Sequence, residues 1–243
     1  GLSVITSLTA QNTFAVREVS DVPLEFIEAQ FDAIHEDFDV GAAKTGMLST
    51  KSIIKTVAKK VGAYSLVVDP VMVAESRGRL LAEDAIETLK EELLPKAVLT
   101  TPNLHEAEIL SGMKITTTDD MKEACKRISR LGCNVVVKGG HLNAMDVLYA
   151  DERFYTFKGY KIEGSFHGSG CTFAASIAAN LALGFDVVVS VANAKAFIGG
   201  AIETAFSAGK GAKVVPPKRC CRAGNNGRSL PVCAGGWDEH LLC

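Results

Sequence analysis

The 243-residue chain lacks the features that define several large classes of protein. No apolar run approaches the ~18 residues that a membrane-spanning helix needs, and the start at Gly1 shows no basic segment followed by an apolar secretory core. The 26 basic and 28 acidic residues give a net charge of −2, which leaves no positive surplus for a nucleic-acid backbone or an anionic membrane. These absences predict a cytoplasmic protein without nucleic-acid or membrane partners.

Two common functional motifs are also missing. Although the chain has seven cysteines, no Cys-x-x-Cys pair occurs, which disfavours a thioredoxin-like site and a regular zinc ribbon. The lysine loop GxxxxGK[ST] is absent too, which excludes a P-loop nucleotide enzyme. Cysteines and a histidine gather near the end of the chain, but their spacing matches no usual zinc-ligand pair: Cys220, Cys221, Cys233, His240 and Cys243.

Short apolar runs rich in β-branched residues alternate with longer segments of helical periodicity up to about Gly211. The pattern predicts strands at residues 4–5, 38–43, 65–68, 97–100 and 134–137, helices at about 81–94 and from 118 to the stop at Gly132, and an edge hairpin at 145–149 and 153–157. Continuous apolar strands joined by helices predict an α/β domain over residues 1–212, with a mostly parallel sheet covered on both faces. Residues 213–243 have no periodicity and are predicted to form a tail outside the core.

Polar residues follow three of the predicted strands, where ligands bind in parallel sheets. Asp69 follows the strand at 65–68, Asn103 and Glu106 follow the strand at 97–100, and Lys138 follows the strand at 134–137. Each residue alone fits a structural role: a turn for Asp69, a helix cap for Asn103, a helix-dipole partner for Glu106, and a solvated strand end for Lys138. Together they supply oxygen ligands for Mg²⁺ and a cation for phosphate, which favours phosphoryl transfer.

A glycine turn precedes the apolar helix that is predicted to end near Gly184. Its residues are Gly168, Ser169, Gly170 and Cys171. Small residues at a helix start let several backbone N–H groups converge on an anion, and the helix dipole adds positive potential there. An ordinary turn before a buried helix is the structural alternative. The polar strand ends favour the anion hole.

Six motifs in this order resemble the hydroxymethylpyrimidine/phosphomethylpyrimidine kinase family of the ribokinase superfamily. They are Thr9-Ala10-Gln11-Asn12-Thr13, Lys44-Thr45-Gly46-Met47-Leu48, Asp69-Pro70-Val71-Met72-Val73, Thr101-Pro102-Asn103 with Glu106-Ala107-Glu108, Val137-Lys138-Gly139-Gly140-His141, and His167-Gly168-Ser169-Gly170-Cys171-Thr172. The resemblance implies a three-layer α/β/α ribokinase-like sandwich and a homodimer. It also implies ATP-dependent phosphorylation of 4-amino-5-hydroxymethyl-2-methylpyrimidine, and then of its monophosphate, in thiamine diphosphate biosynthesis.

The resemblance also implies roles for individual residues. Substrate would contact the side chains of Gln11, Met47, Val71 and Cys171. Mg-ATP would face Asp69, Asn103, Glu106 and Lys138, with Mg²⁺ held by Asp69 and Glu106 directly or through water. The anion hole would be formed by Gly168, Ser169, Gly170 and Cys171. A base that accepts the hydroxymethyl proton and a wall of the pyrimidine pocket are both open roles for Cys171, whereas loop structure is the favoured role of His141 and His167.

Departures from the family pattern leave two alternatives open. Members of the family normally begin with a first strand and a glycine-rich segment that this sequence does not show before Gly1, so we expect the kinase domain to be N-terminally incomplete. A pyridoxal-type kinase of the same superfamily is one alternative, although Cys171 stands where those kinases generally carry Asp. A non-catalytic ligand-binding relative is the other. The retained polar strand ends argue against it.

Overall fold

The computed structural model describes residues 1–72, 83–140, 142, 144–159 and 164–216. Within this part, one central sheet has the strand order β3-β4-β5-β6-β7-β8. β3 to β6 are parallel, whereas β7 and β8 each run antiparallel to the preceding strand. The bounds are β3 Ala42–Thr45, β4 Ser65–Val68, β5 Leu99–Thr100, β6 Asn134–Val137, β7 Met145–Ala150 and β8 Arg153–Lys158. The predicted, mostly parallel sheet is confirmed.

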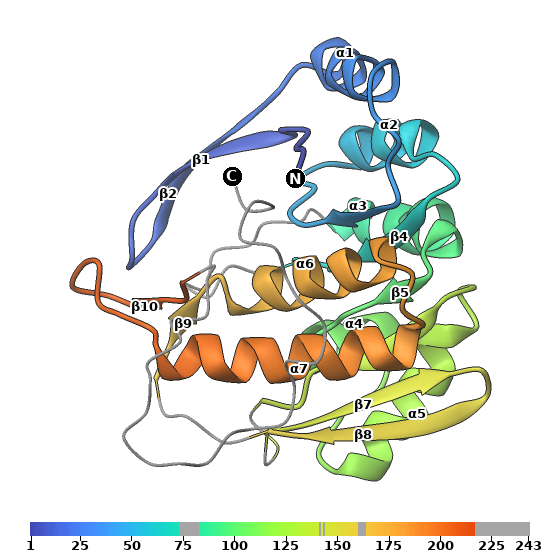
Figure 1. The fold of residues 1–243 in the computed structure, drawn as a ribbon, viewed down its shortest axis with the longest axis vertical. Helices are drawn as coiled ribbons and strands as arrows, with labels where there is room; N and C mark the ends of the chain where they lie inside the picture. Colours follow the sequence, from blue (N-terminus) through green and yellow to red (C-terminus); the bar gives the residue numbers. More distant parts are fainter. Residues whose placement is uncertain (73–82, 141, 143, 160–163, 217–243) are drawn as a thin grey trace.

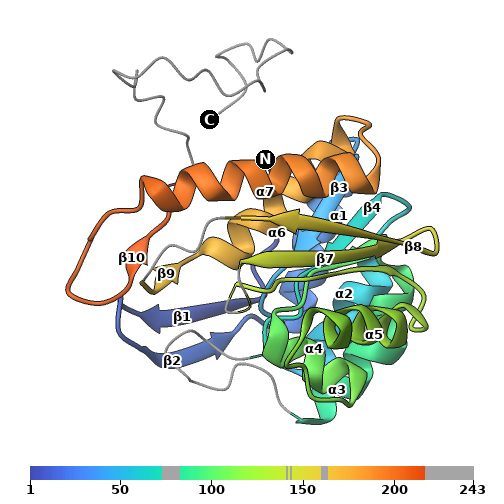
Figure 2. The ribbon, with the colours of Figure 1, turned by 90° about the horizontal axis from the view of Figure 1, so that it is seen from below.

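Successive strand residues point to opposite sides of this sheet, and both sides are apolar. Helices therefore cover both faces. In β4, Leu66 and Val68 pack into the core shared with α1 to α5, whereas Val67 packs into the core shared with α6 and α7. Figure 2 shows α6 and α7 on one side of the strands and α2 to α5 on the other. The bounds are α1 Leu24–His35, α2 Lys51–Lys60, α3 Glu83–Thr88, α4 Leu104–Ser111, α5 Thr118–Ser129, α6 Ser169–Ala182 and α7 Val187–Glu203. The three-layer sandwich is confirmed.

Both helices predicted in the middle of the chain are present, and local sequence signals account for the second. Thr117 caps α5 through a reciprocal bond with Asp120, and the helix stops before Gly132, whose φ of 102° favours glycine. The helix predicted at 81–94 is present from Glu83 and continues through a π turn over Leu89–Leu93. Residues 81–82 lie outside the described part.

The antiparallel pair β7 and β8 confirms the predicted edge hairpin. Its turn falls at Asp151 and Glu152, with φ values of 49° and 60°. Two left-handed residues in succession give a turn whose twist matches that of the strands. Tyr149 and Phe154 face each other across the hairpin with ring centroids 4.8 Å apart.

The predictions for the first forty residues were partly wrong. Residues 4–5 form no strand: Ile5 is 44% exposed, and its backbone N–H and C=O bond to the side chain of Gln30. The predicted strand at 38–43 is displaced to β3. A separate hairpin of β1 (Ser7–Gln11) and β2 (Val16–Asp21), which the pattern did not predict, stands apart from the central sheet (Figure 1).

After α7, the chain packs against the domain again. β10 (Lys213–Val214) pairs in parallel with β9 (Phe166–His167), and Val215 is 6% exposed in the core beside α6 and α7. Residues 213–216, which we assigned to the tail, are therefore part of the folded domain, because the apolar run at 214–215 covers the end of that core. Residues 217–243, with their four cysteines and His240, lie outside the described part.

Candidate active site

Parallel strands bring the predicted polar residues to one edge of the sheet. Asp69 directly follows β4, Lys138 directly follows β6, and Asn103 lies between them at the start of α4. The backbone of Asn103 pairs with that of Lys138 in a parallel bridge, and the Lys138 N–H donates to Pro102 O at 2.8 Å. The order β4-β5-β6 in the sheet thus places these three residues side by side.

Asp69 and Lys138 form a buried ion pair at this edge. Lys138 Nζ donates to Asp69 Oδ1 at 2.9 Å, and the two side chains are 19% and 3% exposed. Thr101 Oγ1 donates to the same oxygen at 3.0 Å. Burial alone would lower the pKa of Lys138, but the carboxylates of Asp69 and Glu106 outweigh it, so the net pKa is raised. Lys138 is therefore a fixed cation at neutral pH.

Glu106 is held in place by the cap of α4. Asn103 Oδ1 accepts the Glu106 N–H at 2.9 Å, and Glu106 Oε2 accepts the Asn103 N–H at 2.8 Å. Glu106 Oε1 lies 3.5 Å from the N–H of Met72. Burial raises the pKa of Glu106 to about 7, the Lys138 charge opposes this, and the Asp69 charge adds to it. The carboxylate of Glu106 therefore caps α4 and also lies beside the Asp69–Lys138 pair.

The glycine turn at the start of α6 faces this ion pair. A Cβ on Gly170 would lie 3.3 Å from Lys138 Nζ and 3.7 Å from Asp69 Oδ2, so the turn and the strand ends meet at one place. Gly168 has φ of 86°, a conformation that favours glycine. Within the described residues, no hydrogen bond uses the N–H groups of Ser169, Gly170 or Cys171. A helix start leaves these donors available to an anion.

Cys171, which follows Gly170 in the turn, is exposed and lies near Gly46, just beyond β3. A Cβ on Gly46 would lie 3.9 Å from Cys171 Sγ and 2.9 Å from Lys44 Nζ. Gly46 thus leaves room for both side chains. Two lysines therefore lie near the predicted catalytic set of Gly168, Ser169, Gly170 and Cys171: Lys138 at Gly170, and Lys44 beside Cys171.

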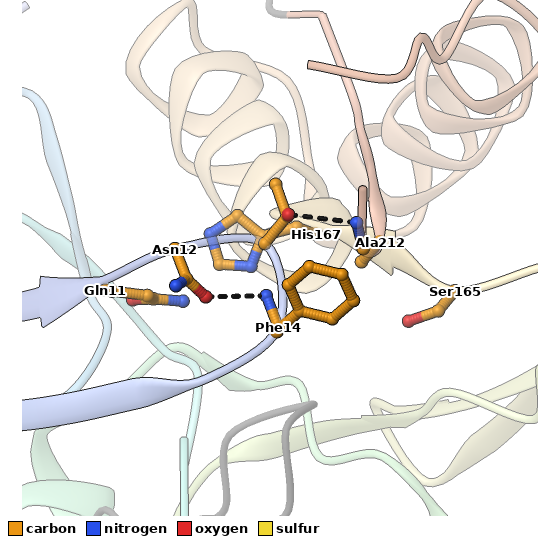
Figure 3. Close-up of a pocket in the computed structure, with 8 residues that line it drawn as sticks. Gln11, Asn12, Phe14, Ser165, His167 and Ala212 are labelled. Carbon is orange, nitrogen blue, oxygen red and sulfur yellow. Dashed lines mark hydrogen bonds between the residues drawn. The ribbon is translucent and has the colours of Figure 1, made fainter. Parts of the chain in front are cut away.

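The predicted substrate residues do not share one cavity. Met47 lines a groove of about 800 Å³ that also contains Lys44, Gly46 and Ala175. Gln11 instead lines a hollow of about 140 Å³ at the tip of the β1–β2 hairpin, together with Asn12, Phe14, Ser165, His167 and Ala212 (Figure 3). Val71 is half-buried directly beyond Asp69 and lines neither cavity. The pyrimidine-binding role of these residues stays a prediction, and His141 lies outside the described part.

Sequence reasoning missed three contributors to the site. Thr101 is hydrogen-bonded to Asp69, and its place directly after β5 was the available signal. Lys44 was part of a quoted motif but received no role. Asp146 accepts the Gly139 N–H at 3.0 Å and the Lys195 Nζ at 2.6 Å, so it fixes the turn that follows Lys138. No local pattern links Asp146 to Lys195, which lies on α7.

The described residues contain no group of three His, Cys, Asp or Glu side chains arranged to hold a metal ion. Magnesium is usually bound by one or two carboxylates together with substrate phosphates, so this arrangement is compatible with Mg²⁺ that arrives with a nucleotide. In the same part of the chain, no helix has both the length and the apolar character needed to cross a membrane.

Comparison with known proteins identifies the family. Residues 1–216 match the phosphomethylpyrimidine kinase family. The hydroxymethylpyrimidine/phosphomethylpyrimidine kinase of Rhizobium meliloti is 43% identical over 213 residues, which are 84% of this chain and 80% of that protein. The thiamine biosynthesis bifunctional protein ThiED of Geobacter sulfurreducens is 43% identical over 219 residues, or 87% of this chain, but the chain spans only 45% of that protein.

Solved structures give the same fold. An ADP complex of Bacillus subtilis pyridoxal kinase has a TM-score of 0.82 and 36% identity, covering 90% of this chain and 86% of that one. The phosphomethylpyrimidine kinase of Clostridium difficile has a TM-score of 0.73 and 40% identity, covering 83% and 86%.

The sandwich and the site at its strand ends define a kinase of the ribokinase-like fold. Within that class, the chain belongs to the phosphomethylpyrimidine kinase family.

Proposed function

We propose that this chain transfers the γ-phosphoryl group of ATP to 4-amino-5-hydroxymethyl-2-methylpyrimidine and then to its monophosphate, in thiamine diphosphate biosynthesis. The observation that carries the proposal is the convergence of the Asp69–Lys138 pair, Glu106 and the glycine turn of α6 at one edge of the sheet. The names of the relatives support the choice of substrate.

In this reaction the chain's own residues position the phosphates and offset their charge. Lys138, held by Asp69, provides a fixed cation, and the N–H groups at the start of α6 donate hydrogen bonds to the oxygens of the transferred group as their charge develops. Cys171, at the start of the same helix, is next to the acceptor. There it serves as the base for the hydroxymethyl proton or as a wall of the pocket.

The residues at the strand ends fit a magnesium ion. Asp69 and Glu106 supply carboxylate oxygens, the type of ligand that Mg²⁺ prefers. Both oxygens of Glu106 already accept N–H groups, which favours contact with Mg²⁺ through water. Mg²⁺ bound here neutralises charge on the phosphates of ATP. The ADP complex of the Bacillus subtilis relative supports ATP as the cosubstrate.

A homodimer in the cytoplasm is the assembly that we propose. The apolar side chains exposed on the β1–β2 hairpin support self-association, since Leu8 and Phe14 are each 60% exposed. The net charge of −2 supports the absence of nucleic-acid and anionic-membrane partners. Light scattering on the purified chain tests the dimer.

The experiment that tests the function measures ADP formation with each pyrimidine acceptor in the presence of Mg²⁺. Lys138→Met should lower kcat by ~10²-fold or more, because it removes a preorganised cation from the transferred group. Lys96→Met is the matched control, because Lys96 is exposed and precedes β5 at the opposite edge of the sheet. ADP formation that does not depend on a pyrimidine acceptor contradicts the proposal.

A pyridoxal kinase activity is the second candidate, favoured by the TM-score of 0.82 to the Bacillus subtilis enzyme. Pyridoxal also carries a hydroxymethyl group on a small ring, so the same site chemistry applies. The assay above separates the two candidates when pyridoxal is included as a third acceptor. No phosphorylation of any of the three, with ATP still bound, would point to a non-catalytic relative.

A further inference from the structure

The site contains two lysines with different electrostatic surroundings. Lys138 donates to Asp69 and lies near Glu106, so its charge is already compensated by acids. Lys44, on β3, has no hydrogen bond or ion pair with any residue in the part of the chain that the structure describes, and it is half-buried. A half-buried lysine with no acid beside it favours an anionic ligand.

The position of Lys44 places this charge on the acceptor side of the site. Its Nζ and the Sγ of Cys171 both lie against Gly46, as their distances of 2.9 Å and 3.9 Å from a Cβ at that residue show. Lys138 lies against Gly170, the neighbour of Cys171 in the turn. Two cations therefore lie near the start of α6. The groove lined by Lys44 is also lined by Met47 and, on α6, by Ala175, one helical turn beyond Cys171.

The two acceptors of the proposed function differ in the charge that they bring to this groove. The hydroxymethyl compound is neutral at its reacting group, whereas a phosphate ester carries roughly −1.5 to −2 at neutral pH. Asp69 already compensates the charge of Lys138 at 2.9 Å, so a second anion at this edge needs another cation. Lys44 supplies such a cation beside Cys171, since both side chains lie against Gly46.

We infer that Lys44 is the phosphate subsite for the monophosphate acceptor and sets the preference for the second phosphorylation over the first. This inference rests on the proposed function. In the second transfer, an oxygen of the acceptor's phosphate bonds to the γ-phosphorus of ATP while the bond from that phosphorus to the bridging oxygen of ADP breaks. ADP leaves with the electron pair. Lys44 holds the remaining oxygens of the acceptor's phosphate during this step.

The experiment compares kcat/KM for the two pyrimidine acceptors in the unmodified chain, Lys44→Met, Lys44→Arg and the control Lys96→Met. Methionine keeps the length of the side chain and removes its charge, and a charge-assisted bond to phosphate corresponds to about a tenfold or greater effect. We expect Lys44→Met to lower the ratio of monophosphate to alcohol kcat/KM at least tenfold, mainly through KM of the monophosphate. Lys44→Arg should restore most of this ratio, and Lys96→Met should not change it.

Calorimetric titration of each acceptor, and a thermal melt of each variant, keep the test independent of turnover and folding. The inference predicts that Lys44→Met weakens binding of the monophosphate more than binding of the alcohol, and that added salt weakens monophosphate binding to the unmodified chain more than to the variant. A ratio that stays within threefold overturns the subsite. A larger loss for the alcohol shows instead that Lys44 assists Cys171. An unmodified chain that binds neither acceptor overturns the proposed function itself.

Discussion

Glu106 links the protonation of the site to the stability of the fold. Its pKa is about 7 in the folded chain against a reference of 4.5, mainly because of burial. Between these values the folded state holds a proton that the unfolded state has released. The contribution of this proton to the free energy of unfolding is therefore largest below about pH 4.5 and is lost as the pH rises through about 7.

Replacing Glu106 by Gln should remove this dependence. In urea unfolding with a chelator present, the unmodified chain should lose more free energy of unfolding from pH 5 to pH 8 than Glu106→Gln does, by on the order of 1 to 3 kcal/mol. Glu108→Gln is the control, because hydrogen bonds from Ile115 and Lys114 lower the pKa of Glu108, so its titration lies below this window. Equal pH dependence in the unmodified chain and Glu106→Gln would falsify the assignment.

The two proposed transfers distinguish the roles of Cys171. An alcohol must lose a proton as it attacks, whereas the phosphate dianion has none to lose. If Cys171 is the base, Cys171→Ser should lower kcat by ~10²- to 10⁴-fold for the hydroxymethyl acceptor and spare the monophosphate. If it is a wall of the pocket, both KM values should rise and kcat should hold. Steady-state kinetics with both acceptors decides, and turnover of the alcohol within threefold excludes the base role.

Much of this site could be predicted because its residues directly follow strands that are neighbours in one parallel sheet. Asp69, Asn103, Glu106 and Lys138 each directly follow a strand or lie in the first turn after one, and parallel neighbours must bring such residues together. The Asp146–Lys195 contact joins residues 49 positions apart on a strand and a helix, and no periodicity indicates it. The position of Lys44 beside Cys171 likewise could not be predicted, because it depends on a tertiary contact at Gly46.

Among the structural elements, those that pack against the core were predicted best. β4, β6 and α5 have apolar residues at the period of their own structure, because each has one or two faces in the core. The β1–β2 hairpin has mostly exposed residues, so its sequence carries no burial pattern. Its position depends instead on hydrogen bonds, which Ser49 makes to Asp21 near its base and Thr13 makes at its tip. Thr13 O accepts the Ala212 N–H, and Thr13 Oγ1 accepts the Gly211 N–H, each at 3.0 Å.

A side chain at Gly211 should release the hairpin tip. A Cβ there would lie 2.2 Å from Thr13 O, which requires the backbone to move. We expect Gly211→Ala to speed amide exchange at Ala212 and to lower the free energy of unfolding by about 1 to 3 kcal/mol. Gly199→Ala on α7 is the control, because nothing lies within 4 Å of its Cβ and the change should stabilise that helix by up to ~1 kcal/mol. Unchanged exchange at Ala212 would show that Thr13 does not hold the tip.

At the scale of the whole molecule, the core beside α6 and α7 includes a residue close to the end of the described part of the chain. Val215 packs with Phe166 and Phe173 in the core beside α6 and α7. β10 pairs in parallel with β9, which leads directly into the glycine turn. The paired strands β9 and β10 therefore join residues 213–214 to the glycine turn at Gly168. The sequence-based boundary at 212 missed this because two-residue strands produce no measurable periodicity.

Two truncations test where the folded domain ends. Removing residues 217–243 should leave the free energy of unfolding within about 1 kcal/mol, because an aperiodic polar segment buries little apolar area. Removing residues 213–243 should cost about 2 kcal/mol or more, since it exposes the site of Val215 and deletes the partner of β9. Urea unfolding of both shortened chains and the full chain, with and without a chelator, provides the measurement. A large loss on removing 217–243 would show that this segment packs on the domain, and one seen only without the chelator would show that its cysteines and His240 bind a metal.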